Sequence, residues 1–254
     1  MTTLNRRHLM ALIGAGAIVP ATALAQDHGA HHGSTPVATP DCHMMDGTPQ
    51  VVPYESDIPF DQAYIDTMIP HHASVIDLAT AAQDVLEDER LLTIAQAILD
   101  TQPGEIEALK ALRLEWYGSD EPDELTHEMM MVTMGDTEAM AACGDHDMGM
   151  GMMGMDMDIK DMMDMMGMDT GMNMMDMDMA MMDGEALVAE FENAEDKDLS
   201  FIDLVIPHHM MAVHQSWVGL QLAEHEELKE ICQDVIDAQQ AEIKDLLEIR
   251  KDLI

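Results

Sequence analysis

The sequence predicts an all-α fold, a four-helix bundle built from two duplicated αα-hairpins with a long Met/Asp/Gly-rich loop between them. Three observations lead to this prediction. Apolar residues recur at helical spacing from Phe60 to Leu112, the pattern returns after residue 184, and a methionine tract separates the two stretches. A single helix pair buries its apolar face poorly, whereas two pairs packed together form a bundle.

The first 25 residues have the pattern of a signal peptide. Arg6 and Arg7 precede an apolar run from Leu9 to Val19, and Ala23-Leu24-Ala25 fits an A-x-A cleavage site. The arginine pair is typical of the twin-arginine export route. A membrane-anchoring helix is the alternative, but the run is shorter than the about 20 residues that crossing requires. We therefore expect an exported protein, in the periplasm or the extracellular space.

Residues 26–59 are rich in His, Pro, Thr and Gly, and we expect a flexible arm there. Export would expose the three cysteines to an oxidising compartment. Cys42 and Cys143 both lie among possible metal ligands, so a disulfide between them and metal binding by either are equally open. Cys232 falls in an apolar helical pattern, which indicates a core residue.

The strongest signal is an internal duplication. A shift of 137 positions aligns residues 61–113 with 198–250 without a gap, and 18 of the 53 pairs are identical. We expect one hairpin over 60–118 and the other over 184–254, with the helices joined near 84–88 and 221–225. Pro103-Gly104 is expected to break the second helix of the first hairpin.

Residues 119–183 are expected to form a methionine-rich loop. Its part from 144 to 183 alternates Met with Asp and Gly and holds 18 of the 30 methionines. It shows no steady helical or strand period, and its polar and flexible residues interrupt every apolar run, so a compact core is excluded. The alternative is an amphipathic helix that fills a groove with methionine, mainly over 159–182.

The charge of the chain indicates what it binds. Fifty acidic and 11 basic residues give a net charge of −39, which excludes nucleic acid as a partner and favours cations. Proteins of organisms that live in strong salt also have acidic surfaces. This alternative explains the charge but not the methionines.

Thioether sulfur is a soft ligand that prefers Cu(I) to magnesium, calcium or zinc. The candidate ligands in the loop are Met152, Met153, Met155, Met162, Met163, Met165 and Met166.

A duplicated Asp-x-x-x-Pro-His-His element carries the second group of candidate ligands. Pro70 and Pro207 each remove one helical hydrogen bond, so each helix is expected to kink where its histidine pair begins. Imidazole and thioether together suit copper. The alternative is that the histidines are structural and pair with Glu105 and Glu242. The candidate ligands are Met68, His71 and His72 in the first copy, and His208, His209, Met210, Met211 and His214 in the second.

The segment Tyr64-Ile-Asp66-Thr-Met68-Ile-Pro70-His71-His72, followed by Gln102-x-x-Glu105-Ile106, resembles domain-of-unknown-function family 305. The resemblance covers 60–118 and 184–254, and implies a ferritin-like bundle that handles copper and silver. Val205 stands where the motif has Met, and Ala73-Ser74 aligns with Met210-Met211, so the two sites are expected to differ. The residues expected to orient the ligands are Asp66, Asp203, Gln102, Glu105, Gln239 and Glu242.

These observations predict an exported copper-binding protein that sequesters, buffers or delivers Cu(I), with Cu(II) and Ag(I) as further candidates. A copper transporter or another copper protein would be its partner. A ferritin-like oxidase acting on Cu(I) or Fe(II) and a methionine-rich interaction module are the alternatives. The sequence has no Gly-rich phosphate loop, no His-Glu-x-x-His and no nucleophile elbow, which disfavours an enzyme.

Overall fold

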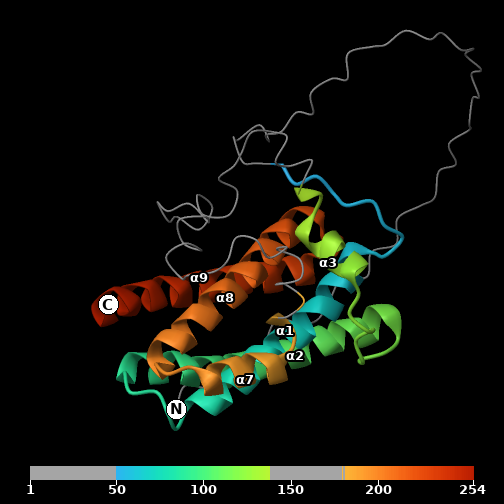
Figure 1. Ribbon diagram of the computed structural model, residues 1–254. Coiled ribbons are helices and arrows are strands. Elements are labelled where there is room, and N and C mark those ends of the chain that lie inside the picture. The colour runs from blue at the N-terminus through green and yellow to red at the C-terminus, as the bar shows by residue number, and fades with distance from the viewer. Residues whose placement is uncertain (1–49, 138–178, 180) are drawn as a thin grey trace, which may run out of the picture. The chain divides into compact units, whose positions relative to one another are not determined.

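The computed structural model describes residues 50–137, 179 and 181–254, and within these ranges the fold is all-α, as predicted. The expected signal peptide, the arm up to residue 49, and residues 138–178 and 180 of the methionine-rich loop lie outside the described residues. None of the described helices combines the length and the apolar character that crossing a membrane requires. The helices are α1 (Phe60–Ala82), α2 (Glu89–Tyr117), α3 (His127–Met134), α7 (Gly184–Asn193), α8 (Lys197–Leu222) and α9 (Glu226–Leu253) (Figure 1).

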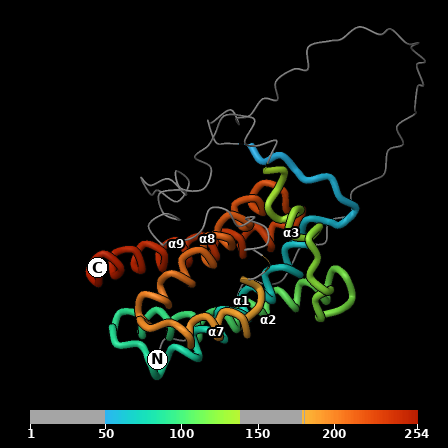
Figure 2. The backbone as a smooth tube through the Cα atoms, in the orientation of Figure 1, coloured from blue at the N-terminus to red at the C-terminus, as the bar shows by residue number. Residues whose placement is uncertain are grey.

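The four long helices form two hairpins that pack against each other. α1 packs along α2, α8 packs along α9, and α1 also contacts α8, as the backbone trace shows (Figure 2). Each hairpin holds the turn of the other. Asp198 in α8 accepts hydrogen bonds from the backbone N–H groups of Glu87 and Asp88, and Asp61 in α1 accepts those of Glu224 and His225. The duplicated aspartate therefore locks the two copies together reciprocally.

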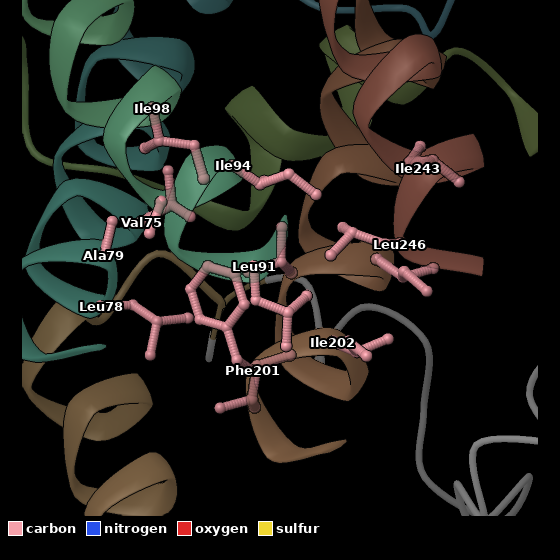
Figure 3. Packing of buried hydrophobic residues seen from close by; sticks show 14 of the residues in the cluster. Val75, Leu78, Ala79, Leu91, Ile94, Ile98, Phe201, Ile202, Ile243 and Leu246 are labelled. Carbon is pink, nitrogen blue, oxygen red and sulfur yellow. The ribbon is translucent and has the colours of Figure 1, made fainter. Parts of the chain in front are cut away.

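The main core lies where the two hairpins meet (Figure 3). Branched and aromatic side chains from both copies fill it, and each fully buried one contributes about 1.5–3 kcal/mol. The labelled members are Val75, Leu78, Ala79, Leu91, Ile94 and Ile98 of the first hairpin and Phe201, Ile202, Ile243 and Leu246 of the second.

The prediction that Pro103-Gly104 breaks a helix is wrong, because α2 continues through both residues. Both are exposed, so water can satisfy the carbonyl that the proline leaves without its N–H partner. The opposite face of α2 buries Ile98, Gln102 and Leu109, and this packing offsets the local cost. α1 and α8 likewise continue through their prolines, and the kinks expected there stay a prediction.

Two short helices flank the methionine tract and were not predicted. α3 lies inside the range expected to be a loop, and Thr126 caps it by accepting from the N–H of Met129. α7 begins at Gly184, where a Cβ atom would lie 2.6 Å from Oδ2 of Asp77 and 3.2 Å from Cα of Ser74. A glycine at this position therefore allows the chain that returns from the tract to lie directly on α1.

Candidate metal centre

Four histidines from the duplicated motif form a row between α1 and α8. His71, His72, His208 and His209 are all fully buried. The ring centroids of His71 and His208 lie 3.7 Å apart, where the two copies meet. His72 lies 5.8 Å from His71, and His209 lies 5.9 Å from His208. The duplication thus brings two sequence-distant pairs into one array, which we call the imidazole row.

The Nε2 atom of every histidine in the row has a hydrogen-bond partner. His72 Nε2 lies 2.7 Å from Oε2 of Glu105, and His209 Nε2 lies 2.7 Å from Oε2 of Glu242. His71 Nε2 donates to the carbonyl of His208 at 2.9 Å. His208 Nε2 lies 2.9 Å from Ser74 Oγ. Carboxylate and carbonyl oxygens only accept, and Ser74 Oγ already donates its single hydrogen to backbone carbonyls, so these bonds place the ring proton on Nε2.

The Nδ1 atoms, by contrast, are buried and have no hydrogen-bond partner in any of the four rings. A neutral imidazole that carries its proton on Nε2 presents a lone pair at Nδ1. Leaving a buried acceptor without a partner costs about 1–3 kcal/mol. A metal ion bound at Nδ1 would remove that cost, and an Nε2–H bonded to a carboxylate is the usual partner arrangement of a metal-binding histidine.

The two central histidines are held neutral. Burial lowers the pKa of His71 and the pKa of His208 well below the ordinary value, and the neighbouring imidazoles lower both further. Protonation would place a charge in a desolvated interior beside another ring. The lone pairs are therefore available at neutral pH without competition from protons.

We expect this depressed pKa to make the metal-free protein less stable in acid. Below the usual histidine pKa of about 6.5 the unfolded chain takes up protons that the folded chain refuses, so the free energy of unfolding falls as the pH falls. Two such histidines contribute a slope of up to about 2.7 kcal/mol per pH unit. Urea unfolding between about pH 7.5 and 5 measures it.

The matched control is His71→Phe/His208→Phe, which removes both groups and keeps flat rings in the row. Subtracting its pH profile from that of the wild type cancels the titration of the many carboxylates. A difference profile that is flat below about pH 6.5 would contradict the assignment of neutral, proton-refusing histidines.

Two glutamines add further unpaired polar atoms one helical turn from the glutamates. Gln102 and Gln239 are buried, and each stands three residues before Glu105 or Glu242, on the same face of α2 or α9. The Oε1 atom of Gln102 and both terminal atoms of Gln239 have no hydrogen-bond partner. The glutamines and glutamates expected to orient the ligands thus share one face on each hairpin.

Asp66 and Asp203 pair with arginines that the sequence analysis missed. Arg113 in α2 donates to both carboxylate oxygens of Asp66, and Arg250 in α9 donates to Asp203 at 2.9 Å. The two arginines form one of the 18 identical pairs of the duplication, and this identity is the sequence feature that points to them. These contacts tie α1 to α2 and α8 to α9, so the structure gives both aspartates a structural partner.

The methionines of the motif do not gather around one point. Met68 is buried in a cluster with Tyr64 and Cys232, while Met210 packs on the main core. Met211 joins a third cluster, and His214 Nε2 donates to the carbonyl of Met134 at 3.1 Å. Burial also lowers the pKa of His214.

Among the cysteines, Cys232 is buried and free, which confirms it as a core residue. Cys42 and Cys143 lie outside the described residues, and so do the seven candidate ligands of the tract, Met152, Met153, Met155, Met162, Met163, Met165 and Met166.

The donor set of the row restricts the kind of metal. Across residues 50–137 and 181–254, no three His, Cys, Asp or Glu side chains converge as a metal-binding group. Structural zinc sites use four ligands of this kind, and calcium takes six or more oxygens. A site built from imidazole nitrogens alone, or completed by thioether sulfur, suits a softer ion.

Comparisons with known proteins place the chain in a family. Three solved structures of CopM resemble it: the Cu(I)-bound form at 23% identity and a TM-score of 0.48, the Cu(II)-bound form at 22% and 0.49, and the Ag-bound form at 22% and 0.48. Each alignment covers 76% of this chain and 96%, 97% and 96% of the respective CopM chain. No curated protein matches the sequence. The family described as "Domain of unknown function (DUF305)" matches residues 61–250, which span both hairpins, and the protein belongs to this family.

Proposed function

We propose that the protein is an exported copper-binding protein that sequesters Cu(I), and that neighbouring rings of the imidazole row bind the ion in pairs, since no three described His, Cys, Asp or Glu side chains converge. The observation that carries this proposal is the set of four buried Nδ1 atoms without partners, each on a ring whose Nε2 is engaged. A purely structural role would be served by histidines with both nitrogens satisfied, since buried polar groups are normally paired.

Copper fits the row better than harder ions do. The available donors are neutral nitrogens of borderline softness, and their number is small. Glu105 and Glu242, at the two ends of the row, provide negative charge that balances a buried cation without binding it directly. Cu(II), which also accepts imidazole, and Ag(I), which shares the softness of Cu(I), are further ions that the same donors would take.

The carboxylates at the two ends of the row are partly exposed. The side chains of Glu105 and Glu242 are 29% and 19% exposed, whereas the histidines bonded to them are fully buried. The net charge of −39 raises the local concentration of cations around these carboxylates. An ion delivered to, or collected by, a copper transporter or another copper protein would pass these carboxylates.

The oxidase alternative receives no support from this geometry. Carboxylate-bridged metal oxidases in helical bundles place glutamates from several helices on the same metals. Here Glu105 and Glu242 each bond their own histidine at opposite ends of the row. The described helices therefore favour binding over turnover.

The test is a titration of the protein with Cu(I) against a competing chelator, combined with X-ray absorption to count nitrogen and sulfur ligands. We expect stoichiometric binding that includes nitrogen ligation. His71→Phe/His208→Phe should lose the copper bound by the row and the nitrogen signal, whereas His127→Ala, at an exposed position in α3, should lose neither. Unchanged stoichiometry and nitrogen ligation in the double variant would overturn the proposal.

A further inference from the structure

A compact group of methionines lies beside the imidazole row. Met130, Met181 and Met211 are buried in mutual contact, and Leu125, Met134, Met179 and Met182 pack against them. We call this group the methionine cluster. The main core, by contrast, is built from Leu, Ile, Val, Ala and aromatic residues, and none of its fully packed members is a methionine. Methionine is therefore concentrated at one place within the described chain.

The cluster joins three separate segments: α3, residues 179 and 181–182, and α8. Hydrogen bonds fix all three. His214 in α8 donates to the carbonyl of Met134, and Ser74 in α1 donates to the carbonyl of Met181 at 2.8 Å. The close approach of Gly184 to α1 holds the third segment from its far side. The sulfurs are thus carried by a fixed backbone.

The cluster breaks the symmetry of the two copies. Met211 follows His208 by three residues, and its counterpart in the first copy is Ser74, which follows His71 by three. Ser74 Oγ contacts both His208 Nε2 and the carbonyl of Met181, so the cluster adjoins the row beside His208. The duplicated bundle does not require such a cluster, since the first copy lacks one.

A side chain that contacts this cluster carries an unpaired polar atom. Gln215 in α8 is fully buried, and its Nε2 donates to Thr133 Oγ1 at 2.9 Å and lies 4.0 Å from Sδ of Met130. Its Oε1 atom is buried without a hydrogen-bond partner. A cation bound nearby would be stabilised by a buried carbonyl oxygen that has no hydrogen-bond donor.

Packing alone does not explain why the residues of this cluster are methionines. Leucine fills a similar volume with fewer rotatable bonds, and the adjoining core uses it. Methionine adds a polarisable sulfur that donates to soft ions. The C-terminal end of α3, where Met134 stands, adds a partial negative charge that favours a cation.

We propose that the methionine cluster binds a monovalent soft cation, Cu(I) or Ag(I), through thioether sulfur, at a site separate from the imidazole row. The sulfurs of Met130, Met181 and Met211 are the ligands, and Met134 completes the set. This proposal rests on the proposed function only in its premise that the protein is exposed to Cu(I) or Ag(I). Binding displaces no proton, because thioethers have none to lose.

The test uses the full chain labelled with [methyl-13C]methionine and titrated with Ag(I), which undergoes no redox change. Single variants M130L, M181L and M211L assign the methyl resonances. We expect those three resonances to shift together in slow exchange, while Met129, a buried methionine outside the cluster, stays unmoved. Cluster resonances that remain in place when the chain is saturated with silver would overturn the proposal.

Two variants separate this proposal from the copper site of the row. In His71→Phe/His208→Phe the silver-induced shifts of the cluster should persist, and their loss would show that the sites are not separate. The triple variant M130L/M181L/M211L should bind one fewer equivalent of Ag(I) and keep the nitrogen-bound copper. An unchanged number of silver equivalents in the triple variant would contradict the proposal, whether or not the row binds copper.

Discussion

Replacing Arg113 with methionine should destabilise the protein by about 3–5 kcal/mol, because it leaves a buried carboxylate without its counter-charge. The side chain of Asp66 is fully buried and that of Arg113 is 4% exposed. The guanidinium contacts both oxygens of the carboxylate and also donates to the carbonyl of Ser119. Urea unfolding measures the loss as a lower midpoint at an unchanged slope.

The duplicated pair provides the matched control. Asp203 is 30% exposed and Arg250 is 10% exposed, so water replaces part of the lost interaction when Arg250 is changed to methionine. We expect a smaller loss there, about 1 kcal/mol. The double variant Asp66→Leu/Arg113→Met should recover most of the stability, since it removes the buried charge altogether. Equal losses of stability in Arg113→Met and Arg250→Met would show that burial of the ion pair does not determine how much its removal destabilises the protein.

The sequence could predict the helices and the repeat because both are local or self-similar properties. Apolar spacing identifies an amphipathic helix without knowledge of its partner. The alignment of His71-His72 with His208-His209 showed that the pairs are equivalent. That the rings of His71 and His208 lie 3.7 Å apart between α1 and α8 depends on how the hairpins pack, which no local pattern determines.

The wrong prediction and the features that were not predicted have a cause of the same kind, because all of them depend on contacts with other parts of the chain. Pro103 lies on the exposed face of α2, and the sequence does not show which face that is. Met68 and His72 share a face of α1, but the side chains of other helices decide what that face contacts. Met68 accordingly packs with Cys232, while Met211 meets Met130 and Met181 from distant segments. Arg113 and Arg250 were visible as an identical pair, but arginine has no obvious place in a helical core.

Replacing Glu105 with leucine should lower the affinity of the row for Cu(I) by about 10–100-fold. The carboxylate accepts the Nε2–H of His72 at 2.7 Å and so fixes the tautomer that leaves Nδ1 free. Without this acceptor the proton is free to move to Nδ1, and the ring can turn. Competition with a Cu(I) chelator measures the change, and Glu242→Leu should repeat it at His209.

Two further variants separate the tautomer from the charge. Glu105→Gln keeps an oxygen that accepts the Nε2–H, so it should lose less affinity than Glu105→Leu if the tautomer matters more. Glu107→Leu removes the same charge from an exposed position of α2, where the side chain is 78% exposed, and should leave the affinity unchanged. Equal losses in Glu105→Gln and Glu105→Leu would assign the effect to charge. Wild-type affinity in Glu105→Leu would mean that His72 Nδ1 does not bind the ion.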